Sequence, residues 1–135
     1  MSFWKREAAR WFRQAEYDLQ EAERCLRSSS YAYACFISHQ SAEKAAKAIY
    51  YLKGEPTYGH DIAILLEGLR KHGIRVDDLV DLGVHLNKFY APTRYPNLHP
   101  SIEKAPFELY SKGDAENCLR CVAEILKRLR EEIER

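Results

Sequence analysis

The chain of 135 residues has few residues that interrupt helices and no apolar run long enough to span a membrane. It contains only 6 Gly and 5 Pro, so turns should be few and elements long, which favours helices over many short strands. Its longest purely apolar or aromatic run, residues 31–37, falls far short of the ~18 residues that a transmembrane helix requires. We therefore expect no membrane segment.

An excess of charge of one sign is also missing. The sequence has 21 Lys and Arg against 20 Asp and Glu, a formal net charge of +1. This balance excludes a broad basic field for nucleic acid, so any such contact must use a local patch. With 46% hydrophobic and 30% charged residues, the composition is that of a globular protein. The length predicts a single all-α domain over residues 1–135.

Signals for export and for metal binding are weak or missing. Residues 1–7 lead into charged amphipathic sequence without the apolar stretch of a signal peptide, which predicts a cytoplasmic protein with free thiols. Cys118 and Cys121 form one C-x-x-C pair, but Cys25 and Cys35 do not form a second. Because a structural zinc site needs four ligands, ordinary buried thiols are favoured over metal.

The glycines do not form either of the phosphate-binding motifs G-x-G-x-x-G and G-x-x-x-x-G-K-[ST], and there is no G-x-S-x-G nucleophile elbow. These absences exclude the common nucleotide cradles and the α/β-hydrolase type of catalysis. We expect neither a metal nor a cofactor.

Apolar residues recur every three or four positions along most of the chain, which predicts five helices. The expected helices are 4–27, 31–53 with Ser30 as a side-chain N-cap, 62–72 after an Asp61 cap, 76–91 with Asp77 and Asp78 in its first turn, and one that follows a Ser111 capping box. Gly54 and Gly73 should end the second and third helices. Short connections favour an up-and-down antiparallel bundle of four to five helices.

Residues 91–110 lack this periodicity and contain four of the five prolines, at positions 92, 96, 100 and 106. A long irregular segment in a compact domain is uncommon and is often functional. Arg94 is suited to bind a phosphate bidentately, and His99 to transfer a proton. Tyr90 and Tyr95 offer rings for base stacking. Alternatively, Arg94 binds carbonyl oxygens at the end of the fourth helix and the tyrosines are packing groups.

Polar residues of the expected second helix have simpler interpretations. His39 lies on or beside the apolar face, where a histidine is usually a satisfied core or interface group. Glu43, Lys44 and Lys47 lie on an adjacent face that reads as solvated surface, with Glu43 and Lys47 as a favourable i, i+4 pair. His60 most simply belongs to the turn before the third helix.

Three stretches together resemble the HEPN domain family (higher eukaryotes and prokaryotes nucleotide-binding), in particular its small standalone prokaryotic type. They are residues 38–48 (SHQSAEKAAKA), the Gly59-His60-Asp61 turn and residues 90–96 (YAPTRYP). The resemblance covers residues 4–131. It implies a helical bundle that is usually dimeric. Many family members are encoded beside a minimal nucleotidyltransferase, with which they form toxin–antitoxin pairs.

Active members of that family are metal-independent endoribonucleases whose R-x(4–6)-H motif forms a composite site at the dimer interface. By this resemblance the motif falls on Arg94, which would bind the scissile phosphate, and on His99, which would act as acid or base at the ribose 2′-hydroxyl. The other residues that the reading assigns to substrate binding are Tyr90, Tyr95, Asn97, His39, Lys44 and His60.

Two functions follow from this reading. The first is a dimeric HEPN module that binds a nucleotide or RNA, or a nucleotidyltransferase partner, without cleavage. The second is an endoribonuclease toxin that uses Arg94 and His99. The near-neutral charge suits the first, because RNA affinity depends heavily on Lys and Arg contacts to phosphate. Aromatic residues of the first helix, Trp4, Trp11 and Phe12, add to the expectation of a homodimer.

Overall fold

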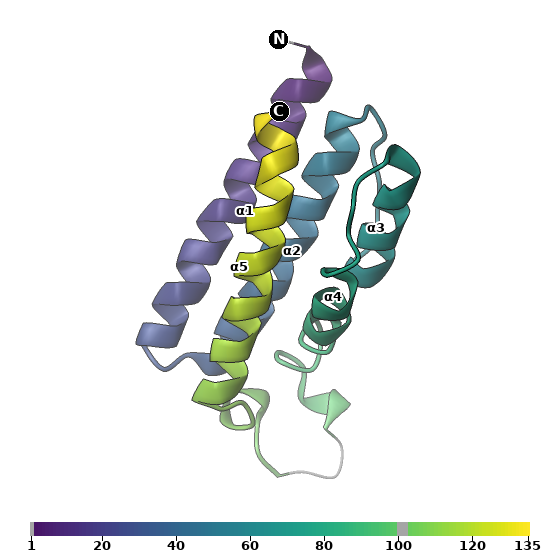
Figure 1. Cartoon of the computed structure of the whole chain (residues 1–135). Coiled ribbons are helices and arrows are strands. Elements are labelled where there is room, and N and C mark those ends of the chain that lie inside the picture. The colour runs from purple at the N-terminus through teal and green to yellow at the C-terminus, as the bar shows by residue number, and fades with distance from the viewer. Residues whose placement is uncertain (1, 100–102) are drawn as a thin grey trace.

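The computed structural model describes residues 2–99 and 103–135, which form five α-helices and no strand (Figure 1). The helices are α1 (Phe3–Arg27), α2 (Tyr31–Leu52), α3 (Ile62–Gly68), α4 (Val80–Asn87) and α5 (Lys112–Glu134). A 3₁₀ turn, Leu69–His72, prolongs α3. The predicted all-α class and the number of helices are confirmed.

Several helix ends lie where the sequence predicts them, for the reasons expected. The Asp61 carboxylate accepts a hydrogen bond from the Ile64 amide at 3.0 Å and caps α3. Ser111 and Asp114 cap α5 reciprocally, each side chain accepting from the other's backbone N–H. Gly54 and Gly73, with φ of 72° and 75°, take the left-handed conformation that ends their helices.

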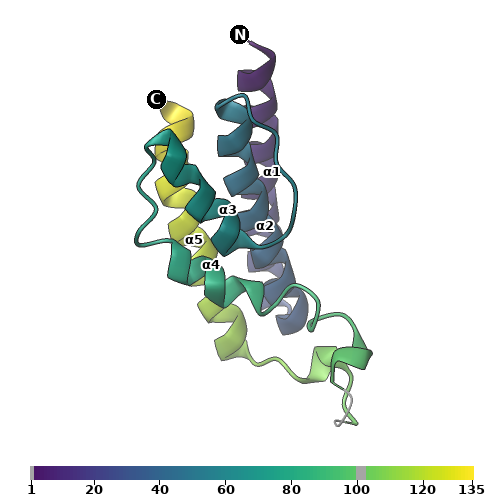
Figure 2. The ribbon, with the colours of Figure 1, turned by 90° about the vertical axis from the view of Figure 1, so that its right-hand side faces the viewer.

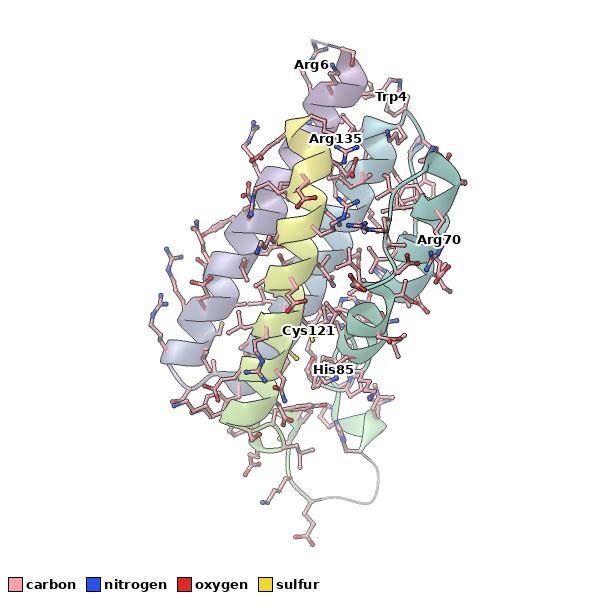
Figure 3. All side chains as sticks on the ribbon, in the orientation of Figure 1. Trp4, Arg6, Arg70, His85, Cys121 and Arg135 are labelled. Atoms are coloured by element: carbon pink, nitrogen blue, oxygen red, sulfur yellow. The ribbon has the colours of Figure 1, made fainter. Side chains whose placement is uncertain are left out.

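Two predicted helix starts are wrong in detail. Ser30 precedes α2, but its side chain makes no capping hydrogen bond, and its ψ of 69° is far from the extended backbone typical of a cap. The fourth helix begins at Val80 instead of near residue 76. Asp77 lies in the turn before it and pairs with Arg70, at the outer side of the molecule (Figure 3).

The long helices α1, α2 and α5 form the body of the bundle, and α1 runs antiparallel to both others (Figure 1). The short α3 and α4 pack beside α2 and lead the chain back to the end of the bundle where α5 begins (Figures 1 and 2). Helix α2 is in contact with α1, α3, α4 and α5. It is therefore the central helix.

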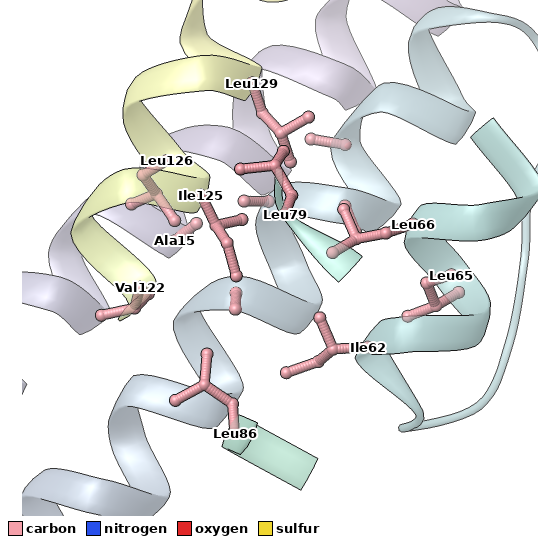
Figure 4. Packing of buried hydrophobic residues seen from close by; sticks show 14 of the residues in the cluster. Ala15, Ile62, Leu65, Leu66, Leu79, Leu86, Val122, Ile125, Leu126 and Leu129 are labelled. Carbon is pink, nitrogen blue, oxygen red and sulfur yellow. The ribbon is translucent and has the colours of Figure 1, made fainter. Parts of the chain in front are cut away.

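This central position buries α2 on almost every side. Five of its alanines are fully buried, which allows close approach by its neighbours, and leucines and isoleucines of α3, α4 and α5 fill the space around it (Figure 4). The burial includes His39, Glu43 and Lys47. The predicted pairing of Glu43 with Lys47 is confirmed at 2.8 Å, but the expectation that both lie on solvated surface is wrong.

The described residues of the segment 91–110, which are 91–99 and 103–110, are irregular as predicted, with short 3₁₀ turns at Pro96–Leu98 and Pro106–Glu108. Pro100 lies outside the described residues. Two of the aromatic residues of α1 have partners within the chain, because Phe12 is buried and Trp11 stacks on Tyr51 with ring centroids 5.4 Å apart, whereas Phe3 and Tyr17 are 55% and 46% exposed. None of the described helices has the length and apolarity that crossing a membrane requires, and all four cysteines are free.

Candidate functional site

The ring of Tyr90, just after α4, lies at the centre of a group of rings from separate segments. Its centroid is 4.6 Å from that of His60, in a nearly parallel stack, and 5.0 Å from that of His39. Phe36 of α2 is 6.3 Å away. We call Phe36, His39, His60, Tyr90, Arg94 and Tyr95 the Tyr90 cluster. It unites residues that lie up to 59 positions apart in the sequence.

Arg94 is held in this cluster by its own backbone neighbourhood and by aromatic faces. Its Nε and Nη2 donate to the Tyr90 carbonyl oxygen at 3.1 and 2.7 Å, so Arg94 does bind a carbonyl just beyond the fourth helix. Its Cζ lies 3.9 Å from the Phe36 ring centroid and 4.9 Å from that of Tyr95. The guanidinium has five N–H groups, and those left over are available to an anion.

Glu43 of α2 is a buried carboxylate that binds the His60 ring of the Tyr90 cluster. Its Oε2 accepts from Lys47 Nζ at 2.8 Å, and its Oε1 accepts from His60 Nδ1 at 2.9 Å. Only 7% of its side chain is exposed. An unpaired charge in such a place is costly, and here two donors keep the carboxylate satisfied.

His39 is fully buried and holds the turn that carries His60. Its Nε2 donates to the His60 carbonyl oxygen at 2.9 Å. Burial lowers the pKa of His39, against the opposing effect of the nearby Glu43 carboxylate, so the neutral ring is favoured. In that tautomer Nδ1 carries a lone pair, in agreement with its lack of a hydrogen-bond partner and its 4.0 Å separation from Glu43 Oε1.

His99 lies outside the Tyr90 cluster. Its Nε2 donates to the Pro92 carbonyl oxygen at 2.7 Å, and its ring meets that of Tyr110 edge-on at 6.5 Å. No hydrogen bond or ring contact joins it to Arg94 within the described residues.

The remaining two residues assigned from the sequence are also elsewhere. Asn97 is exposed in the turn at Pro96–Leu98. Lys44 points toward α1, where its Nζ lies 2.6 Å from Asp18 Oδ2 and borders an open cleft of about 800 Å³ beside Trp11 and Tyr51. Of the predicted binding residues, the structure brings together Tyr90, Tyr95, His39 and His60, with Arg94.

Sequence reasoning missed two residues of this region, Phe36 and Glu43. Phe36 is one of several apolar residues in the run 31–37, and nothing in the pattern distinguishes it from the others. Glu43 lies 17 positions before His60, the residue that it contacts. The i, i+4 pairing of Glu43 and Lys47 was visible, but it gave no sign of burial. No group of three or more His, Cys, Asp or Glu in residues 2–99 and 103–135 is arranged to hold a metal ion.

The sequence model of the HEPN domain family matches residues 8–133. Together with the five-helix bundle and the ring and arginine cluster after α4, this match shows that the chain belongs to the HEPN domain family.

Two solved structures are each 35% identical to this chain. That of TT1696 from Thermus thermophilus has a TM-score of 0.87 and covers 93% of this chain and 97% of its own. That of ST0689, an archaeal HEPN homologue, has a TM-score of 0.78 and covers 94% and 98%. A curated protein of Methanocaldococcus jannaschii, "Putative toxin MJ1304", is 27% identical over 123 residues, 85% of this chain and 80% of that protein.

Proposed function

We propose that this protein is an HEPN module that binds RNA, or a nucleotide, at the Tyr90 cluster. The observation that carries the proposal is the guanidinium of Arg94, held 3.9 Å from the Phe36 ring and beside two tyrosines, with N–H groups left for a phosphate. Unpaired bases are commonly recognised by stacking on aromatic rings and on Arg planes. Tyr95 is 49% exposed and therefore available for such stacking.

Fluorescence anisotropy with short, labelled single-stranded RNA tests this proposal. Arg94→Gln and Tyr95→Ala should each weaken binding by about 10-fold to 100-fold, since a lost stacking or charged contact costs ~1–3 kcal/mol. Arg75→Gln is the matched control, because Arg75 is exposed in the connection between α3 and α4. Unchanged affinity in both cluster variants would contradict the proposal.

The proposed role is that of the toxin of a toxin–antitoxin pair in the cytoplasm, acting as a homodimer with a minimal nucleotidyltransferase as partner. The name of the Methanocaldococcus jannaschii relative supports the toxin role. The partner and the homodimer are what the family resemblance implies. Co-purification of the tagged chain with the product of a neighbouring nucleotidyltransferase gene tests the partner, and recovery of the chain alone would count against it.

The second candidate function is a metal-independent endoribonuclease that uses Arg94 and His99. The hydrogen bond from His99 Nε2 to the Pro92 carbonyl favours it, because it orients the ring and leaves Nδ1 for proton transfer. By the family resemblance, this site would be composed of residues from two protomers. Cleavage of RNA in EDTA that persists in His99→Ala would discard the assignment.

A further inference from the structure

We propose that Glu43 and His60 form a carboxylate–imidazole pair that cleaves RNA bound at the Tyr90 cluster. The inference rests on the proposed RNA binding and adds a reaction and an acid–base group to it. His60 Nδ1 donates to Glu43 Oε1 at 2.9 Å, which places the proton of the neutral ring on Nδ1. Nε2 is then a free base on a side chain that is 53% exposed.

The surrounding residues hold this imidazole from three directions. The second oxygen of Glu43 is bound by Lys47 Nζ at 2.8 Å, and His39 Nε2 holds the His60 carbonyl oxygen at 2.9 Å. Tyr90 stacks on the imidazole face with an interplanar angle of 19°. A ring held in this way is preorganised for proton transfer.

The burial of Glu43 distinguishes this pair from ordinary surface packing. A histidine that merely ends a loop needs no carboxylate, and burying a carboxylate beneath it costs solvation free energy. A buried carboxylate that orients an imidazole and stabilises its protonated form is a recurring arrangement for general base catalysis. Arg94 lies against the same Tyr90 ring, with its Cζ 5.1 Å from the ring centroid, and would bind the phosphate of the RNA.

The reaction is an internal transesterification without any redox change. His60 Nε2 takes the proton of the ribose 2′-hydroxyl, and the 2′-oxygen forms a bond to phosphorus. The bond from phosphorus to the 5′-oxygen breaks, and the imidazolium gives its proton to that oxygen. The products are a 2′,3′-cyclic phosphate and a 5′-hydroxyl. DNA of the same sequence lacks the 2′-hydroxyl and should not be cleaved.

The decisive variant is His60→Gln, which keeps an N–H donor for Glu43 but cannot carry a proton to and from the substrate. Single-turnover cleavage of end-labelled RNA in EDTA, at saturating protein, should be about 10²-fold to 10⁴-fold slower than with the wild-type chain. His72→Gln is the matched control, because His72 also contacts a glutamate, Glu55, at 3.2 Å but lies outside the cluster. It should cleave at the wild-type rate.

Glu43 is a positioning residue, and a comparison of cleavage rate with RNA affinity tests this role. The charged or titratable groups around His60 are His39, Glu43, Lys47, Asp61, Tyr90 and Arg94. Glu43→Gln removes the carboxylate that fixes the orientation of the His60 imidazole, so single-turnover cleavage should slow while the affinity for RNA stays at the wild-type value. Because Lys47 then loses its partner, Glu43→Gln with Lys47→Met serves as a second variant in which the lost charge is balanced.

Each outcome decides between the inference and the binding proposal. Cleavage at the wild-type rate by His60→Gln overturns the inference. Wild-type protein that binds RNA but leaves it intact between about pH 5 and about pH 8 also overturns it, while the proposed binding function stands. Failure of the wild-type protein to bind RNA removes both.

Discussion

At the scale of single residues, the most informative feature is the group of polar side chains inside α2. His39, Glu43 and Lys47 lie one turn apart on the central helix, and all three are buried. They avoid an unpaired buried charge in different ways. Burial lowers the pKa of His39 and so favours its neutral ring, whereas Glu43 and Lys47 form an ion pair. These differences lead to separate predictions for stability.

Lys47→Met should destabilise the fold by about 3 kcal/mol, because it leaves Glu43 with only a half-exposed histidine as partner. Lys44→Met is the matched control, since Lys44 pairs with Asp18 at 28% exposure and should contribute less than about 1 kcal/mol. Urea unfolding followed by circular dichroism measures both. Equal effects would show that burial of the Glu43–Lys47 pair has little energetic consequence.

His39 predicts how stability varies with pH. Burial lowers its pKa in the folded state, so below the ordinary value of about 6.5 the unfolded chain binds more protons than the native one. The free energy of unfolding should therefore fall as pH falls below about 6.5. Burial lowers the pKa of His85 as well, which adds a slope of the same sign.

His39→Gln keeps a donor for the His60 carbonyl and removes the titrating group. Urea unfolding at a series of pH values should show a shallower decline for this variant than for the wild-type chain. A decline as steep as that of the wild type would assign the effect to other groups.

At the scale of helices and turns, local chemistry was readable from the sequence and long-range placement was not. Asp61, Gly73 and Ser111 act within a few residues of themselves, so their caps and stops were predicted correctly. The predicted start of the fourth helix was wrong, because Asp77 pairs with Arg70, which lies outside the expected helix. Periodicity alone carries no information about such a contact.

The candidate site shows the same division. Its position after the fourth helix followed from the prolines and from the loss of periodicity, and Arg94 and Tyr90 were identified there. The contact of Glu43 with this site could not be predicted from the sequence. The polar face of an amphipathic helix normally lies in water, but α2 is surrounded by four other helices, and its polar residues are buried. His60 meets its partner Glu43 because the turn that carries His60 packs against α2 in the folded chain.

Gly68 allows Tyr50 of α2 to pack closely against α3. A Cβ at this position would overlap the hydroxyl of Tyr50, which donates to the Leu65 carbonyl oxygen at 2.6 Å. Although alanine favours helix, Gly68→Ala should therefore destabilise the fold by ~1–3 kcal/mol. Gly113→Ala in the first turn of α5 meets only the Ser111 hydroxyl, 3.6 Å away. It should be neutral or stabilise by up to about 1 kcal/mol in thermal unfolding.

If Gly68→Ala unfolds at the same temperature as the wild-type chain, the contact between Tyr50 and α3 is not a limit on packing. Loss of stability in Gly113→Ala would instead show that the first turn of α5 needs a glycine, in contradiction to its open surroundings. The pair separates helix propensity from packing, because both changes add the same methyl group.

At the scale of the whole molecule, three of the exposed apolar side chains lie near one end of the bundle. Leu98 and Phe107 lie in the irregular segment that leads into α5, and Tyr33 lies in the first turn of α2, which begins at the same end (Figures 1 and 2). On α1, Phe12 is buried and Trp11 stacks on Tyr51, whereas Phe3 and Tyr17 are 55% and 46% exposed. We propose the end that carries Leu98 and Phe107 as the dimer interface.

We expect the wild-type protein to sediment at twice the mass of the chain. Phe107→Ser should weaken self-association by about tenfold or more, because Phe107 is 71% exposed in one chain and an apolar anchor at an interface often dominates its binding energy. Tyr58→Ser is the matched control, since Tyr58 is 86% exposed in the connection between α2 and α3, outside the segment that carries Leu98 and Phe107. Sedimentation velocity across a dilution series compares the three proteins. A wild-type protein that is monomeric at all concentrations would exclude the dimer and the composite site of Arg94 and His99. The Glu43–His60 pair would still stand, because all of its contacts lie within one chain.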